Sequence, residues 1–142
     1  MNALHERIRA SFDAQGLMAT LGARLAHVGE GEVHIAMPFA PALSQQHGYA
    51  HAGSITSIVD SACGYAALTR APSSGHEVVT AEFKVNFMRP AIGRRFVAVG
   101  KVVQAGRSMA VATGEVRAFA DEGADDYKVV ALMQATMVFV VG

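Results

Sequence analysis

The spacing of apolar positions along the chain predicts two helices of different length. Apolar residues recur at every fourth position from Leu4 to Phe12, which predicts a short amphipathic helix that ends near Gly16. From about Gly53 to Thr69 apolar residues follow the i, i+3, i+4, i+7 rule, with Ser54 as the expected N-cap. The remaining positions of this second helix are mostly small, so it can approach a sheet closely.

Alternating apolar and polar positions predict six strands. Val33, Ile35 and Met37, for example, alternate with polar or small neighbours. The strands are expected at Thr20–Val28, Glu32–Pro38, Val78–Arg89, Arg95–Gln104, Ser108–Ala120 and Tyr127–Val141. Short turns between the last four favour antiparallel neighbours. The order predicts a single α+β domain over residues 1–142, a strongly curved antiparallel sheet wrapped around one buried helix.

Composition narrows the class of protein. Hydrophobic residues make up 51% of the chain and charged residues 17%, which excludes disorder and indicates that another subunit covers some apolar surface. The formal charge is zero and no basic block is present, so no nucleic-acid partner is expected. A lone cysteine, Cys63, excludes an internal disulfide. With no secretory leader and no long apolar run, we expect a cytoplasmic protein without membrane contact.

Asp60 is the strongest candidate for chemistry, because it is the only charged residue between Gln46 and Thr69. An isolated carboxylate in an apolar helix costs several kcal/mol unless it is paired, hydrogen-bonded or protonated, and such groups are enriched at functional sites. The alternative interpretation is a structural carboxylate that bonds Ser57, Thr56 or a neighbouring backbone group. Cys63, one turn later, is interpreted as a packed apolar residue.

The start of the long helix is the second candidate. Unbonded backbone N–H groups of Ala52 and Gly53, together with the helix dipole, can stabilise negative charge. Asp60 lies about 10 Å beyond Gly53 along the same helix, so it cannot easily face these donors. A partner helix in antiparallel register would bring them together, which favours a site shared across a dimer. His47 and His51 have the spacing of a zinc pair but lack a third ligand, so no metal is expected.

Three stretches together resemble the phenylacetic-acid-degradation (PaaI-like) branch of the hotdog-fold thioesterases. They are Gln45 to Gly53 (QQHGYAHAG), the carboxylate nine residues after His51, and the strand segment from Val79 to Pro90. The resemblance extends from about Gly16 to Phe139. It implies an acyl-CoA thioesterase for aryl-acyl or medium-chain acyl groups that needs no cofactor. It also implies a homo-oligomer with its active site at the dimer interface, a tetramer built as a dimer of dimers.

The resemblance also implies roles for individual residues. Asp60 corresponds to the catalytic carboxylate, as general base or nucleophile, and Thr80 to the hydroxyl that assists it. Gln45 corresponds to an amide that holds water or the thioester. Ala52 replaces a glycine of the family whose N–H is used, and alanine keeps that N–H. His51, with Gly48, is expected to brace the loop. Candidates for the phosphates or pantetheine of CoA lie near strand ends: Arg89, Arg107 and Ser108.

Two other functions stay open on the sequence alone. A hydratase or dehydratase of the same fold would need a histidine placed with the carboxylate for proton transfer, and His51 is the only nearby candidate. A non-catalytic acyl-CoA-binding oligomer is the second alternative, although the chain carries no attached effector domain.

Overall fold

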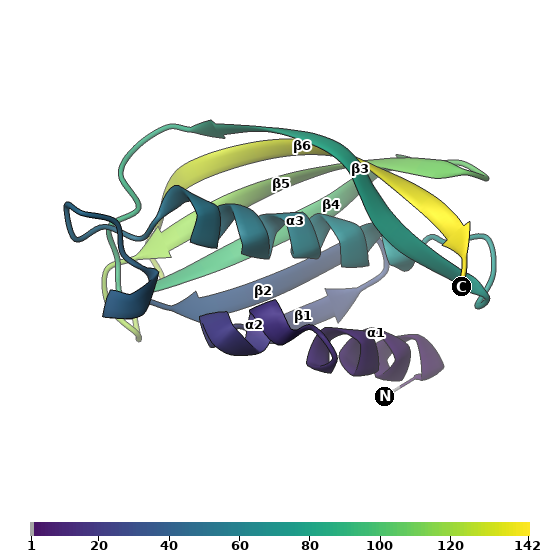
Figure 1. Ribbon diagram of the computed structural model, residues 1–142, viewed down its shortest axis with the longest axis horizontal. Helices are drawn as coiled ribbons and strands as arrows, with labels where there is room; N and C mark the ends of the chain where they lie inside the picture. The colour runs from purple at the N-terminus through teal and green to yellow at the C-terminus, as the bar shows by residue number, and fades with distance from the viewer. Residues whose placement is uncertain (1) are drawn as a thin grey trace.

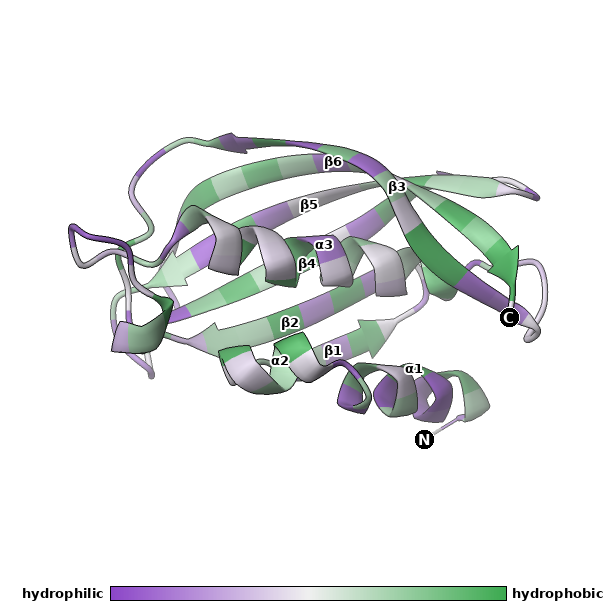
Figure 2. Ribbon diagram, viewed as in Figure 1, coloured by the Kyte–Doolittle hydropathy of each residue, from purple (hydrophilic) through white to green (hydrophobic). Residues whose placement is uncertain are grey.

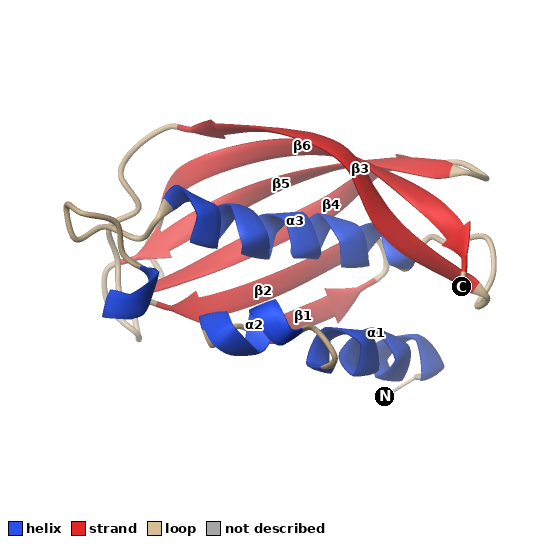
Figure 3. Cartoon of the chain, in the orientation of Figure 1, coloured by secondary structure: helices blue, strands red, loops and turns tan. Residues whose placement is uncertain are grey.

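The computed structural model describes residues 2–142 and confirms the predicted α+β architecture (Figure 1). The elements are α1 (Ala3–Asp13), α2 (Gly16–Leu21), β1 (Arg24–Gly29), β2 (Glu32–Pro38), the 3-10 turn η1 (Pro41–Leu43), α3 (Ala52–Leu68), β3 (His76–Phe87), β4 (Arg95–Ala105), β5 (Met109–Phe119) and β6 (Lys128–Val141). The six strands form one antiparallel sheet in the order β1-β2-β4-β5-β6-β3. The expectation that the last four strands are successive neighbours is wrong for the first pair, because β3 pairs with β6 and β4 lies between β2 and β5. The sheet curves around α3, as Figure 3 shows.

Helix α3 packs tightly on the sheet because its residues and those beneath it are small. Ile58 and Ala62 are fully buried against the sheet. A Cβ atom added to Gly100 of β4 would lie 2.5 Å from the backbone of Ala62, so only glycine permits this approach. Figure 2 shows apolar residues along the strands beneath the helix. This close packing sets the rotation of α3 about its axis, and with it the direction of the side chains on its other faces.

The region before β1 differs from the prediction. Thr20–Val28 was expected to be one strand, but its first residues belong to α2, and β1 begins only at Arg24. Gly22 ends α2 in the left-handed conformation at φ 67°, and Met18 and Leu21 are buried at helical spacing. Gly16 likewise begins α2, whereas α1 already ends at Asp13. A short helix capped by glycine has too few residues to show a clear period, which explains the error.

Strand β3 lies at one edge of the sheet and is unusually open. It pairs with β6 on one side only, and its other side has no neighbour within residues 2–142. Most of its residues are exposed, including the apolar side chains of Val79, Phe83 and Phe87, which are 50%, 42% and 47% exposed. Long open edges of this kind are templates for pairing with another chain.

Two absences apply to residues 2–142. None of the helices there has the length and apolarity to cross a membrane. That part of the chain also has no group of three His, Cys, Asp or Glu residues arranged to hold a metal ion.

Candidate active site

The start of α3 is organised by His51. This residue is the N-cap, with extended backbone, and its Nδ1 accepts the Gly53 N–H at 2.7 Å. The Ser54 hydroxyl instead donates to the His51 carbonyl at 2.7 Å, so the prediction of Ser54 as N-cap is wrong. Serine is the commoner N-cap residue, but here the helix begins three residues before the start that a Ser54 cap implies, and the His51 imidazole accepts the otherwise unbonded N–H of Gly53. The structure therefore gives His51 a bracing contact at the helix start.

This cap changes which backbone donors are free. The expectation that both N–H groups are unbonded is wrong for Gly53, because its N–H is engaged by His51. The Ala52 N–H has no acceptor among residues 2–142. Ala52 also needs no glycine-like backbone, since the only positive φ angles in the described chain belong to glycines. Alanine at this position therefore leaves the helix start unstrained and keeps one free donor.

The loop before α3 holds Gln45 beside the helix start. The Gln45 Oε1 accepts the N–H groups of His47 at 2.5 Å and Tyr49 at 3.3 Å. Gly48 makes this tight turn possible at φ 85°. Since Oε1 is occupied within the loop, the Nε2 group is the part of the amide left for other partners. Gln45, His51 and Ala52 share a cavity of about 290 Å³.

Asp60 lies in the middle of α3, half-buried, and Thr80 of β3 is its partner. The Thr80 hydroxyl donates to the Asp60 carboxylate at 2.7 Å. Burial raises the pKa of Asp60 above its ordinary value, and the hydrogen bond from Thr80 opposes that rise. Asp60 and Thr80 line a cavity of about 310 Å³ between α1, α3 and β3. The lone carboxylate thus has one hydroxyl partner and access to a cavity.

Cys63 is not a competing nucleophile. It is fully buried, and burial together with the negative charge of Asp60 raises the pKa of its thiol to about 12. The thiolate is the reactive form of cysteine, so this side chain is inert at neutral pH.

The two halves of the candidate site do not meet within one chain. Asp60 is eight residues beyond Ala52, which places it about 12 Å farther along the helix. Among residues 2–142, none lines both the helix-start cavity and the Asp60 cavity. The structure therefore brings Asp60 to Thr80, and Gln45 to His51 and Ala52, as two separate groups.

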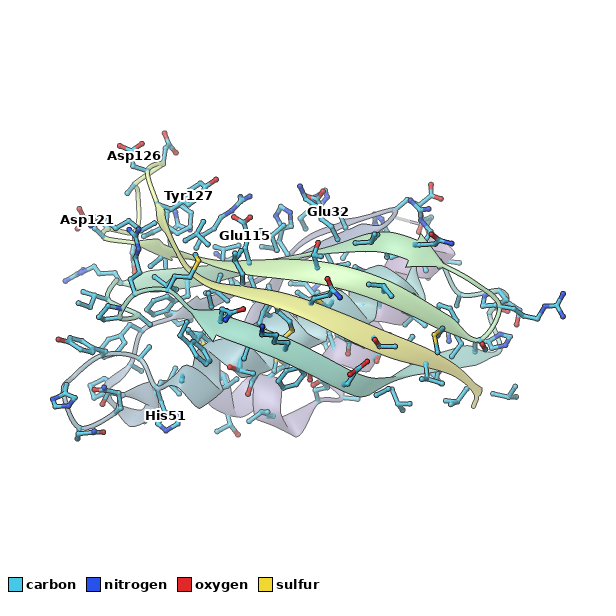
Figure 4. The ribbon with its side chains drawn as sticks, turned by 90° about the horizontal axis from the view of Figure 1, so that it is seen from above. Glu32, His51, Glu115, Asp121, Asp126 and Tyr127 are labelled. Atoms are coloured by element: carbon cyan, nitrogen blue, oxygen red, sulfur yellow. The ribbon has the colours of Figure 1, made fainter. Side chains whose placement is uncertain are left out.

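The residues expected to bind CoA are also divided. Arg89 follows β3 and lines both the helix-start cavity and an adjoining cavity of about 600 Å³. Asp126 and Tyr127 also line that adjoining cavity. Figure 4 shows His51 at the same end of the molecule as these two residues. Arg107 and Ser108 form the β4–β5 turn at the opposite end of the sheet, where Phe139 donates its N–H to the Ser108 carbonyl at 3.0 Å.

Sequence reasoning missed the contacts between the N-terminal segment and α3. Gln15 donates through Nε2 to the Tyr65 hydroxyl at 2.8 Å, and the Ser11 and Tyr65 hydroxyls are 3.0 Å apart. Gln15 and Ser11 also line the Asp60 cavity. No local pattern marks these residues, because only the packing of α1 against α3 brings them together.

The sequence of residues 47–124, more than half of the chain, matches the family model described as the thioesterase superfamily. A thioesterase family protein from Silicibacter pomeroyi is 43% identical in sequence, and its structure matches with a TM-score of 0.93 over 99% of this chain and 100% of its own. The PaaI protein from the E. coli phenylacetic acid degradation operon is 21% identical, with a TM-score of 0.85 over 98% of this chain and 94% of its own. Thioesterase HI1161 from Haemophilus influenzae is 19% identical, with a TM-score of 0.82 over 99% and 92%. The predicted PaaI-like hotdog fold is thereby confirmed.

Proposed function

This chain belongs to the thioesterase superfamily and is a thioester hydrolase, and we propose that it hydrolyses aryl-acyl- or medium-chain acyl-CoA to the free acid and CoA. The observation that carries the proposal is the pairing of the half-buried Asp60 with Thr80 in a cavity of its own. A carboxylate with a raised pKa is a better base, and Thr80 holds it in one orientation.

Asp60 serves as general base or as nucleophile. As a base it takes a proton from water while the water oxygen bonds to the thioester carbonyl carbon. The carbon–sulfur bond then breaks, and the same proton passes to the CoA sulfur. As a nucleophile, Asp60 bonds to the carbonyl carbon and releases CoA, and water hydrolyses the resulting anhydride. Both routes end with the same free acid and thiol.

The helix start supplies the counterpart for the carbonyl oxygen. The free Ala52 N–H is the donor for the developing negative charge, and the positive end of α3 adds to it. Gln45 presents its Nε2 group to the same cavity, where it orients the thioester or the water. His51 and Gly48 hold this loop and transfer no proton.

Assembly across the open edge of β3 joins the two halves. Antiparallel pairing of β3 with the same strand of a second copy places Asp60 and Thr80 beside the helix start of the partner subunit. The exposed apolar residues Val79, Phe83 and Phe87 support this edge as the contact. Antiparallel pairing sets opposite ends of the two sheets side by side, so we expect Arg89 to approach Arg107 and Ser108 of the partner subunit. An arginine pair of this kind suits the phosphates of CoA.

Two such dimers are expected to join into a tetramer. Within residues 2–142 no helix covers the face of the sheet opposite α3, which Figure 4 shows from above. Leu132 and Val103 are 45% and 63% exposed. Burying this face against a second dimer would remove that apolar surface from water. Light scattering of the purified protein measures the assembly directly.

A thiol-release assay tests the catalytic proposal. Benzoyl-, phenylacetyl- and hexanoyl-CoA are offered to wild type and to Asp60→Asn, in which the amide neither accepts a proton nor attacks. We expect the variant to lose about 10²–10⁴ in kcat. Asp13→Asn, at an exposed position of α1, is the matched control and should keep the wild-type rate. Equal rates for wild type and Asp60→Asn would refute the role of Asp60.

A further inference from the structure

The cavity beside Asp60 is bounded on one side by the N-terminal segment. Ser11 of α1 and Gln15, just after it, line this cavity together with Tyr65 of α3. The Gln15 amide donates to the Tyr65 hydroxyl at 2.8 Å, and the Ser61 hydroxyl donates to Gln15 Oε1 at 3.4 Å. This side of the cavity is therefore held in place by side-chain hydrogen bonds to the helix that carries Asp60.

The same segment is also fixed to β3, the other wall of the cavity. Arg7 donates to the His76 carbonyl and, at 3.3 Å, to the Glu77 carboxylate. Ile8 and Phe12 of α1 are buried, and the Phe12 and Tyr65 ring centroids are 6.3 Å apart. Helix α1 thus contacts both α3 and β3, through a buried apolar face and through the polar side chains of Arg7 and Ser11.

We propose that Ser11 of α1 and Gln15 form the end wall of the acyl-group site and restrict it to compact, uncharged acyl groups. This inference rests on the proposed thioesterase function. The cavity of about 310 Å³ is at the small end of the ~300–1,000 Å³ range of ligand pockets. The charged CoA portion must reach solvent, so the acyl group is the part that the walled end accommodates.

The charges around the cavity exclude anionic acyl groups. Asp60 and Glu77 both line it, and within residues 2–142 the only cation that contacts either of them, Arg7, is already paired with Glu77. An acyl group that ends in a carboxylate meets two like charges there and no free cation. We expect pentanoyl-CoA to be strongly preferred over succinyl-CoA, which is similar in length but ends in a carboxylate.

Two substitutions change the depth of the cavity in opposite directions. Gln15→Ala removes part of the wall and should move the preference toward longer acyl groups. Gly64→Ala adds a methyl group that meets Val78 Cγ1 at 3.8 Å and Met137 Sδ at 4.0 Å, which is ordinary contact, so the fold tolerates it. That methyl group narrows the cavity. For the longest acyl group that wild type accepts, Gly64→Ala should lower kcat/KM by about tenfold or more, because one methylene in a fitted pocket is worth about 10–200-fold.

The experiment measures kcat/KM for a ladder of straight-chain acyl-CoA thioesters from acetyl to decanoyl. The ratio of long-chain to short-chain kcat/KM is compared among variants, so damage to the shared chemistry cancels. The expected result is a ratio raised in Gln15→Ala, lowered in Gly64→Ala and unchanged in Asp13→Asn. If the ratio of long-chain to short-chain kcat/KM is the same in wild type and all three variants, the proposed end wall is refuted.

A binding experiment separates this inference from the proposed function. S-alkyl-CoA thioethers of the same chain lengths cannot be hydrolysed, and calorimetry gives their Kd with each variant. If wild type releases no thiol but Gln15→Ala still shifts the preferred chain length in binding, the proposed end wall is supported and the proposed hydrolysis of acyl-CoA is refuted. If the Kd values show the same chain-length preference in every variant, the proposed end wall is refuted, regardless of the rate of thiol release.

Discussion

The start of α3 and its middle contribute to the proposed site in different ways. At the start, the functional group is a backbone N–H at Ala52, positioned by the His51 cap and by the Gln45 loop. In the middle, the functional group is a side chain, Asp60, half-buried and held by Thr80. Every residue except proline has a backbone N–H, so many residues could supply the donor at position 52. The proposed base at position 60, in contrast, requires a carboxylate side chain. Ala52 should therefore tolerate any side chain that keeps the N–H, whereas Asp60 should tolerate no replacement that removes the carboxylate.

The largest expected effect on activity comes from two variants, each of which removes one half of the proposed site, and from combining them in one dimer. Asp60→Asn removes the base, and Ala52→Pro removes the N–H donor at the first helical position, where proline is well tolerated. Each variant alone should lose at least about 10² in kcat. When the two are co-expressed, half of the dimers are mixed, and each mixed dimer has one site with both intact halves. We expect recovery of about a quarter of wild-type activity, measured as thiol release per total protein.

Ala52→Gly is the matched control for that experiment, since it keeps the N–H and should retain nearly full activity. Native mass spectrometry establishes that mixed dimers form. If mixed dimers are present and the mixture stays inactive, the two halves are not shared between subunits and the proposed interface site is refuted.

Some elements were predictable from sequence because local spacing determines them. β2 was expected at Glu32–Pro38 and lies there, since Val33, Ile35 and Met37 all point into the core. The long helix was placed within a residue of its observed ends for the same reason. Asp60 stood out because nothing else in its helix is charged.

Other features depend on contacts that no local pattern reveals. Gln15 and Tyr65 are 50 residues apart in sequence and meet only after α1 packs on α3. The His51 cap was missed because Ser54 is the more usual capping residue and stands nearby. Which N–H groups at the helix start are bonded depends on the three-dimensional arrangement of His51 and not on the local sequence pattern.

Thr80→Val tests whether Thr80 tunes the acidity of Asp60. Thr80 donates to Asp60 and thereby lowers the pKa of that carboxyl, so its removal leaves burial unopposed and raises the pKa. Because the reaction requires ionised Asp60, the acid limb of the kcat/KM profile should move to higher pH. At a pH below the wild-type limb we expect a loss of about tenfold, the size associated with a hydrogen bond to a charged group. Thr80→Ser keeps the hydroxyl and should leave the limb in place. A limb that stays fixed in Thr80→Val would show that Thr80 does not tune Asp60.

His51→Ala tests the first half through stability. The substitution leaves the Gly53 N–H without its side-chain acceptor, and loss of an N-cap lowers the free energy of unfolding by about 0.5–2 kcal/mol. Urea denaturation measures this change, and His51→Asn should restore most of it because asparagine is a good N-cap. Activity should fall far less than in Ala52→Pro, because the Ala52 N–H remains. A loss in His51→Ala as large as in Asp60→Asn would instead make His51 a proton-transfer residue.

The smallest expected effect is a gain in stability on removal of the Asp60 charge. Burial raises the pKa of Asp60 in the folded protein, so the folded state holds its proton more tightly than the unfolded state does. Ionisation therefore works against folding at neutral pH, and this penalty disappears as the pH falls through the folded pKa toward the unfolded value. Asp60→Asn should raise the free energy of unfolding at pH 7 by less than about 1 kcal/mol, because Asp60 is only half-buried and solvent screens the charge. The gain should vanish in acid, below the unfolded pKa. Paired urea titrations at pH 7 and in acid measure it, and a variant less stable than wild type at pH 7 would mean that Asp60 stabilises the fold.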